Sequence, residues 1–312
     1  MDARPYCDLN TFLRRRFGVR VQKITVDAGF TCPNRDGTRG TGGCIYCNPR
    51  GSGTGAHGQG ISIRDQLEAG KAALARRYKA RAFIAYFQAF SNTYAPLETL
   101  RERYGEALSV PDVVGLSIGT RPDCVDEPIL DLLTAHARHT MVWIEYGLQS
   151  AHDRTLADIG RGHDVAAFSR AVEATRHRGI HICAHVILGL PGETAADMRA
   201  TARFVAASGI DGVKLHLLYV VAQTEMARRY RQGAYQCLTQ AAYVERVCDV
   251  LERLPPQMVI QRLTGDPHPG ELVAPDWALR KRETLDLIHA ALARRQTYQG
   301  KCYRVDPGSS PG

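Results

Sequence analysis

Three cysteines that lie close together carry the clearest capacity for chemistry in this 312-residue chain. Eleven residues separate Cys32 from Cys44, and two separate Cys44 from Cys47. The two-residue gap lets two thiolates bind one metal or cluster, and the glycines of the intervening segment let a third thiolate approach. Because four nearby cysteines would favour a closed structural site, three predict a metal centre with one open coordination position.

Three interpretations of these cysteines are open from their spacing. A zinc site would be completed by Cys7 or by His57. Unligated thiols would have to be buried, although the flanking Gly, Asp, Arg and Asn residues are typical of a loop. A [4Fe–4S] cluster with an open iron would hold S-adenosylmethionine, and this interpretation alone predicts further cofactor contacts on later strands.

The elements that must position the cysteines alternate between short apolar, β-branched runs and longer segments of helical period. The apolar runs cover 21–29, 82–90, 112–120, 141–149, 181–189 and 212–220. The helical segments lie near 63–79, 96–108, 126–137, 151–159, 164–178 and 194–208. This alternation predicts parallel strands with right-handed crossovers, in an open sheet or a partial (β/α)6 TIM-like barrel. Either fold has its site at the carboxyl ends of the strands.

Beyond residue 222 the pattern is mostly helical, with one apolar run at 258–265 that could form a seventh strand. No linker, repeat or low-complexity segment separates two domains. We therefore expect an α/β barrel over residues 1–222 and a C-terminal helical extension over residues 223–312 that packs on it.

The composition is that of a soluble globular protein, with 44% hydrophobic and 23% charged residues. No run approaches the length of a membrane-spanning helix, and Asp2 and Arg4 stand where a signal peptide would need apolar residues. We expect a cytoplasmic protein without a membrane partner. In that reducing compartment, cysteines serve as metal ligands or buried thiols rather than as disulfides.

The motifs along the chain form an ordered set: DAGFTCPNRDGT, GGCIYC, FQAFSNTYAP, GTRPD, GLQS, GLPGET, KLHLL and RLTGDP. This set resembles the radical S-adenosylmethionine (SAM) superfamily and, within it, the bacterial YhcC/YtqA-type proteins. Most superfamily members have three residues between the first two cysteines. The longer gap after Cys32 is similar to that of the Elongator catalytic subunit.

The resemblance implies the partial barrel of the radical SAM type and a site for two cofactors. Cys32, Cys44 and Cys47 would hold a [4Fe–4S] cluster, and SAM would chelate the fourth iron. An electron donor such as flavodoxin or ferredoxin would drive cleavage of SAM to methionine and a 5′-deoxyadenosyl radical. The SAM-binding residues that the resemblance implies are Tyr46 and Gly189 at the adenine, Gln88, Ser91 and Asn92 at the amino group, and Gln149 and Arg161 at the ribose and carboxylate.

Each of these residues also has a simpler structural interpretation. Tyr46 could be an ordinary packed aromatic residue, and Arg161 a solvated cation at a helix end. We expect Lys214 and His216 to be catalytic residues near the substrate, because two ionisable groups on one face of a core strand are costly unless they are paired or line a cavity. The alternative for His216 is a hydrogen-bonded core histidine.

The charge balance, 40 Lys and Arg against 32 Asp and Glu for a net charge of +8, favours a polyanionic partner. Basic clusters occur at 14–16, 76–81, 228–231 and 280–282. The resemblance implies a tRNA partner and modification of the C5 side chain of its wobble uridine, in the processing of carboxymethylaminomethyluridine. Two other functions stay open: a radical enzyme acting on a small metabolite or peptide, and a non-enzymatic, zinc-stabilised RNA-binding protein.

Overall fold

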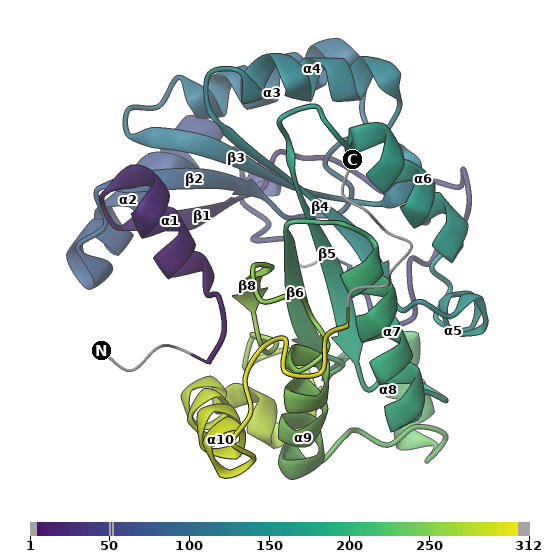
Figure 1. Ribbon diagram of the computed structural model, residues 1–312. Helices are drawn as coiled ribbons and strands as arrows, with labels where there is room; N and C mark the ends of the chain where they lie inside the picture. Colours follow the sequence, from purple (N-terminus) through teal and green to yellow (C-terminus); the bar gives the residue numbers. More distant parts are fainter. Residues whose placement is uncertain (1–4, 50, 52, 305–312) are drawn as a thin grey trace.

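The computed structural model describes residues 5–49, 51 and 53–304. In these residues, seven parallel strands follow one another in chain order and form a curled half-barrel (Figure 1). The strands are β1 (Val21–Val26), β2 (Ala82–Phe87), β3 (Val113–Thr120), β4 (Met141–Gln149), β5 (His181–Leu188), β6 (Gly212–Leu217) and β8 (Val259–Arg262). The first six coincide with the predicted apolar runs, and β8 lies within the run at 258–265. The expected partial barrel is confirmed.

Helices connect the successive strands and cover the outer face of the sheet (Figure 1). They are α2 (Ile63–Tyr78), α3 (Leu97–Leu108), α4 (Glu127–Ala137), α5 (Asp153–Asp158), α6 (Val165–Thr175) and α7 (Ala195–Ala207). Four of them begin after a side-chain oxygen that accepts a backbone N–H, which stabilises the helix start: Ser62, Asp126, Asp164 and Thr194. No helix in the described part of the chain has the length and apolar character needed to span a bilayer.

Side chains alternate along each strand between the outer and the inner face of the barrel. In β4, Ile144, Tyr146 and Leu148 are fully buried in the main core, which the strands share with the helices. Trp143 and Glu145 of the same strand are also fully buried but lie inside the barrel. The apolar outer positions thus determine which residues of each strand face the interior.

Apolar side chains fill the interior at the amino-terminal ends of the strands. This lower interior cluster consists of Leu13, Val21, Ala82, Ile84, Met141, Trp143, Cys183 and Val259. Helix α1 (Leu9–Phe17) covers it, and the ring of Phe12 meets that of Trp143 edge-on at a centroid distance of 5.8 Å. The barrel is therefore closed at this end.

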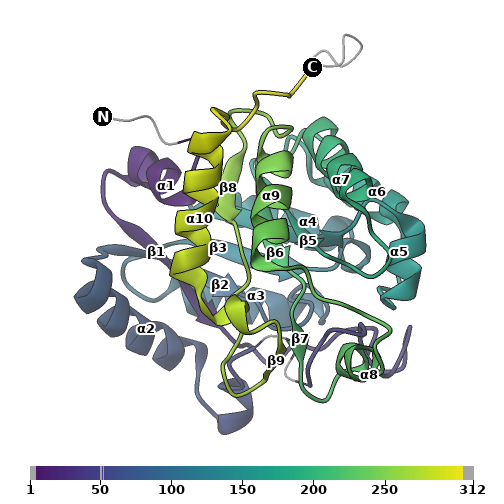
Figure 2. The same ribbon diagram turned by 90° about the horizontal axis from the view of Figure 1, so that it is seen from below.

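The residues after 222 add β8 to the sheet beside β6 and supply α8 (Glu225–Arg231), α9 (Gln240–Leu251) and α10 (Lys281–Arg294). Helices α9 and α10 pack against each other (Figure 2). A short antiparallel pair, β7 (Val220–Val221) with β9 (Leu272–Ala274), was not predicted. The turns η1 (His57–Gln59), η2 (Pro122–Cys124) and η3 (Asp276–Leu279) are short 3-10 helices.

Both ends of the described chain meet beside β8. Asp8 forms a β-bridge with Ile260. The buried side-chain amide of Gln299 donates to the carbonyl oxygens of Pro255 at 2.6 Å and Met258 at 2.8 Å, and its oxygen accepts the backbone N–H of Cys7 at 2.9 Å. One glutamine thus joins the N-terminal segment to the loop before β8.

Candidate functional site

A cavity of about 620 Å³ opens at the carboxyl ends of the strands. It brings together many residues that the sequence predicted for the site: Cys32, Cys44, Tyr46, Cys47, Gln88, Gln149, Arg161 and His216. The other predicted residues do not line it: Ser91, Asn92, Gly189 and Lys214. The cavity collects side chains from loops that are far apart in the sequence, which is expected where parallel strands end at one edge.

The loop that carries the cysteines is fixed by Asn34, which sequence patterns did not single out. Its amide donates to the carbonyl oxygens of Gly160 at 2.9 Å and Arg161 at 3.0 Å. The same nitrogen lies 3.7 Å from the sulfur of Cys44. Asn34 is almost fully buried, so these hydrogen bonds are shielded from water and position the cysteine loop against the segment after β4.

Arg161 is buried beside Cys44 and is not a solvated cation at a helix end. Its guanidinium donates to the carbonyl oxygen of Gly147 at 2.9 Å, and Nη1 lies 3.7 Å from the Cys44 sulfur. Burial alone would lower the pKa of Arg161, but the neighbouring Tyr46 and Cys44 raise it above its usual value. Arg161 is therefore charged at the point where an anion could approach the cysteines.

Tyr46 and Gln149 complete this side of the cavity. Tyr46 packs against a small cluster of apolar residues, and burial, followed by the influence of Cys44, raises the pKa of its hydroxyl well above the ordinary value. Gln149 has a φ of 72°, a left-handed conformation that is costly for a residue with a side chain. A strained backbone at a cavity edge is common where a side chain must be aimed at a ligand.

Ser91 and Asn92 lie behind the cavity wall, where they support other residues. The hydroxyl of Ser91 accepts the backbone N–H of Arg121 at 3.1 Å, and the amide of Asn92 donates to Gly119 at 2.7 Å. Arg121 in turn is fully buried and donates to the carbonyl oxygen of Arg161 at 2.6 Å. The GTRPD motif therefore has a supporting role that sequence reasoning did not identify.

Gly189 faces the C-terminal extension. Its carbonyl oxygen accepts the hydroxyl of Tyr235 at 2.7 Å, and a Cβ added at this glycine would lie 3.1 Å from Leu238. With a φ of 89°, the position favours glycine for its backbone conformation as well.

The floor of the cavity is a charged interior cluster of Lys23, Ser117, Glu145, His185 and Lys214. The fully buried carboxylate of Glu145 accepts Nζ of Lys23 at 2.6 Å and Nε2 of His185 at 2.7 Å, and it also binds Ser117 and Lys214. Burial would raise the pKa of Glu145, but Lys214, Lys23 and His185 hold it well below its usual value. Sequence reasoning missed Glu145, although a lone carboxylate in the apolar run 141–149 was a usable signal.

The predicted pair Lys214 and His216 lies at this floor. Burial lowers the pKa of Lys214 to about 7, despite its contact with Glu145. The ring of His216 lies 5.1 Å from that of His185, and burial keeps its pKa well below the usual value. Lys214 is therefore a structural partner of Glu145 as well as a candidate proton donor, whereas neutral His216 lines the cavity directly.

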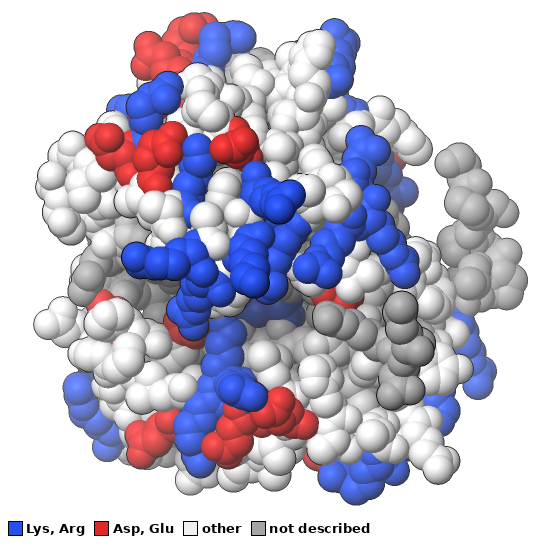
Figure 3. Space-filling model, turned by 90° about the vertical axis from the view of Figure 1, so that its left-hand side faces the viewer, with Lys and Arg blue, Asp and Glu red and all other residues white. Residues whose placement is uncertain are grey.

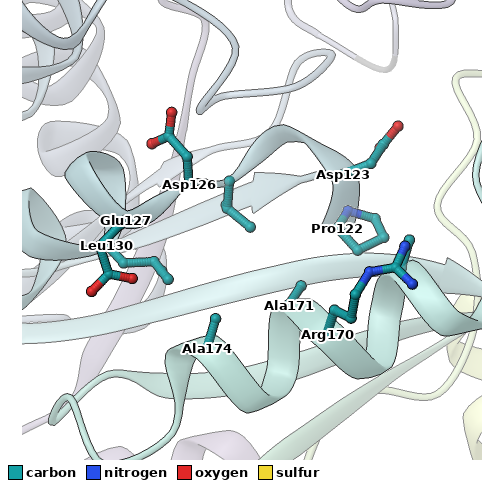
Figure 4. Close-up of a pocket in the computed structure, with 10 residues that line it drawn as sticks. Pro122, Asp123, Asp126, Glu127, Leu130, Arg170, Ala171 and Ala174 are labelled. Carbon is teal, nitrogen blue, oxygen red and sulfur yellow. The ribbon is translucent and has the colours of Figure 1, made fainter.

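A second, smaller cavity of about 240 Å³ lies between η2, α4 and α6, outside the barrel (Figure 4). Leu130, Ala171 and Ala174 form its apolar wall, and Asp126 and Arg170 stand at its edge. It contains no cysteine and none of the predicted site residues.

The chemistry of the main cavity fits an iron–sulfur cluster better than a zinc ion. Among the described residues, no three His, Cys, Asp or Glu side chains already stand in the arrangement of a metal site. Three thiols share the cavity, and neither Cys7 nor His57 lines it as a fourth ligand. Cys7 packs instead at the closed end of the barrel, and His57 lies against Gly29. Thiolates with nearby N–H donors are the usual environment of such clusters.

Comparisons with known proteins give the same result. A family model described as the radical SAM superfamily matches residues 35–205, and one described as the radical SAM C-terminal domain matches residues 210–294. The protein YtqA from Bacillus subtilis is 42% identical over 299 residues, which are 96% of this chain and 93% of YtqA. Elongator complex protein 3 from Homo sapiens is 27% identical over 168 residues, 53% of this chain and 30% of that protein. The solved structure of Elp3 from Methanocaldococcus infernus has the same fold, with a TM-score of 0.65 at 15% identity over 89% of this chain and 64% of that chain.

Proposed function

Since the chain belongs to the radical SAM superfamily and is a radical SAM enzyme that uses a [4Fe–4S] cluster and SAM, we propose that Cys32, Cys44 and Cys47 are the cluster ligands. The observation that carries this proposal is the presence of all three cysteines in one cavity with Arg161 and Gln149. When bound and reduced by a donor such as flavodoxin or ferredoxin, the cofactors supply a 5′-deoxyadenosyl radical.

The residues of this chain position SAM and protect the reaction from water. Arg161 offers a buried guanidinium to a carboxylate, and Tyr46 offers an apolar ring to the adenine. Gln88 and Gln149 offer amide groups at the mouth of the cavity. The lower interior cluster fills the other end of the barrel with apolar side chains, which keeps water away from the reaction on that side.

We propose that the substrate is the C5 side chain of the tRNA wobble uridine. The sequence resemblance to the Elongator catalytic subunit supports this class, and so does a basic surface formed by Arg14, Arg15, Arg16, Arg20, Arg76, Arg77, Lys79 and Arg81. The predicted cluster at 76–81 lies beside Arg20 there, because Arg20 and Arg77 both lie over the ring of Tyr78, at 5.3 and 5.1 Å. Within the described residues, none of the eight forms an ion pair.

The position of the basic surface limits the kind of RNA. It lies on α1 and α2 and the turns before β1 and β2, at the closed end of the barrel (Figure 3). Near the mouth, by contrast, Arg229 pairs with Asp158 and Lys281 with Asp266. An RNA that uses the basic surface must therefore extend along the barrel to bring a base to the mouth, which a folded tRNA can do and a mononucleotide cannot.

The cofactor part of the proposal is tested on anaerobically purified protein. A brown protein with about four irons per chain that forms 5′-deoxyadenosine under dithionite supports it. A colourless protein with stoichiometric zinc contradicts it and favours the RNA-binding alternative.

The tRNA part is tested by comparing the nucleosides of tRNA from cells with and without the gene. Accumulation of carboxymethylaminomethyluridine in the deletion strain, reversed by the wild-type gene but not by a Cys44→Ala gene, supports the proposal. An unchanged nucleoside profile contradicts it and favours a small metabolite or a peptide as substrate.

A further inference from the structure

One guanidinium at the floor of the main cavity has no partner in the described residues. Arg262 is the last residue of β8 and lies opposite Lys214 in the register of β6 and β8. Its side chain lines the cavity, and it forms no hydrogen bond or ion pair there. Arginine stays charged in proteins, so an unmatched positive charge borders the cavity.

The carboxylates that line the cavity are already engaged. The carboxylate of Glu145 already binds Lys23, His185 and Lys214 of the charged interior cluster. Asp266 pairs with Lys281 at 2.6 Å, and Glu271 accepts the side-chain amide of Asn48 at 2.7 Å. Each of the three carboxylates therefore has its own partners, and the guanidinium is left available to bind an anion that enters the cavity.

His216 is a second polar side chain of the cavity that lacks a partner among the described residues. Its Nε2 is buried and has no hydrogen-bond partner among the described residues, which is costly for a polar atom. Burial lowers the pKa of His216, and the charge of Arg262 lowers it further, so the two side chains are close enough to influence each other. With its proton on Nε2, His216 would donate to the same acceptor as the guanidinium of Arg262.

We propose that Arg262, with His216 beside it, binds a carboxylate of the substrate inside the barrel. A planar guanidinium holds a carboxylate through two parallel hydrogen bonds, and one unmatched cation balances one negative charge. The inference rests on the proposed function, whose substrate, carboxymethylaminomethyluridine, has a side chain that ends in a carboxylate. Arg262 then distinguishes this side chain from an aminomethyl group, which is cationic.

Two other singly charged groups have the same chemistry: the carboxylate of SAM and an RNA phosphodiester. Arg161 is better placed for SAM, because its guanidinium lies 3.7 Å from the sulfur of Cys44. The charge of Arg262 acts on His216 and Lys214, at the floor of the cavity. The cavity thus has one buried arginine, Arg161, at the cysteines and one half-buried arginine, Arg262, at the floor.

The experiment uses the reconstituted, anaerobic holoenzyme with Arg262→Gln, Arg262→Lys and, as a matched control, Arg203→Gln on the exposed surface of α7. The first probe is tRNA with carboxymethylaminomethyluridine, compared with the same tRNA carrying aminomethyluridine. Wild type and Arg203→Gln should bind the carboxymethyl form about tenfold more tightly, as expected for one charge-assisted hydrogen-bonded pair. Arg262→Gln should lose this preference, and Arg262→Lys should restore part of it.

The second probe is acetate, measured by calorimetry on the same proteins without RNA. Wild type should bind it and Arg262→Gln should not. If acetate binds as expected while wild type binds neither tRNA, the result supports the carboxylate site and contradicts the proposed RNA substrate.

Four results would overturn the proposal. Equal weakening of both tRNAs by Arg262→Gln would identify a phosphodiester as the ligand, and a matching loss of SAM affinity would identify the SAM carboxylate. A preference that survives in Arg262→Gln would show that tRNA modification does not use this site. Wild type that neither binds acetate nor prefers the carboxymethyl form has no carboxylate site.

Discussion

The barrel interior consists of two layers that lie two residues apart on the same strands. Trp143 of β4 and Cys183 of β5 belong to the lower interior cluster, whereas Glu145 and His185, the next inward residues, belong to the charged interior cluster. The lower layer is held together by apolar contacts. The upper layer forms the floor of the cavity and is held together by charges that satisfy one another.

The two layers differ in the free energy that they contribute to folding. Apolar burial in the lower layer contributes favourable free energy directly. The upper layer pays for the desolvation of several charges, and such clusters are often no more stable than an apolar replacement. Its position directly below the main cavity supports the proposal that these residues take part in the reaction, whereas the lower layer closes the barrel.

The largest expected effect comes from replacing a cysteine of the main cavity by alanine, compared with the same replacement in the lower layer. Cys44→Ala should abolish 5′-deoxyadenosine formation under dithionite while the protein stays folded, because a proposed cluster ligand is lost. Cys183→Ala makes the same chemical change in the lower layer and should retain product formation per folded protein. Retained SAM cleavage in Cys44→Ala would refute the ligand assignment.

Glu145→Gln tests the upper layer itself. It leaves Lys23 and Lys214 without their shared carboxylate, so we expect a loss of about 3–5 kcal/mol in the free energy of unfolding, measured with urea. The double variant Glu145→Met with Lys214→Met removes both partners and should recover part of this loss. The single variants Glu145→Met and Lys214→Met complete the cycle, and a double variant whose loss equals the sum of their losses would show that the charges are not coupled.

His185 gives the upper layer a pH dependence. Its pKa is lowered by burial to about 4, so between pH 6.5 and 4 the unfolded chain binds a proton that the folded protein does not. Stability should therefore fall as the pH drops through this window, by about 3 kcal/mol from this group. His185→Gln should show a shallower fall in urea titrations. An unchanged slope would place the acid sensitivity elsewhere.

The smallest effect should come from the lower layer. Ile84→Val removes one buried methylene and should cost about 1 kcal/mol in the free energy of unfolding. The affinity for SAM should not change, since Ile84 does not line the cavity. A change in SAM affinity would mean that the two layers are not independent.

Much of this fold could be read from the sequence, because periodicity reports directly on which faces are buried. The six predicted strands and the six predicted helices are present with boundaries shifted by a few residues. The β7–β9 pair was missed, since strands of two and three residues carry no periodic signal.

The site was harder to predict than the fold. Residues with a motif, such as Cys44 and Arg161, could be found, but the partners that fix them could not. Asn34 acts through backbone carbonyls more than one hundred residues away in sequence, at 160 and 161. Arg262 faces the cavity because the register between β6 and β8 shifts just before it. Such shifts follow from three-dimensional packing and not from local sequence.

The hydrogen bonds of Gln299 have a consequence for the order of events during synthesis. The chain leaves the ribosome from its N-terminus, so the cysteine loop is made before more than two hundred further residues, including the one that joins Cys7 to the loop before β8. The contact of Gln299 with Cys7 can therefore form only after almost the whole chain has been translated. The three cysteines therefore leave the ribosome long before the contact that joins the two ends of the chain can form.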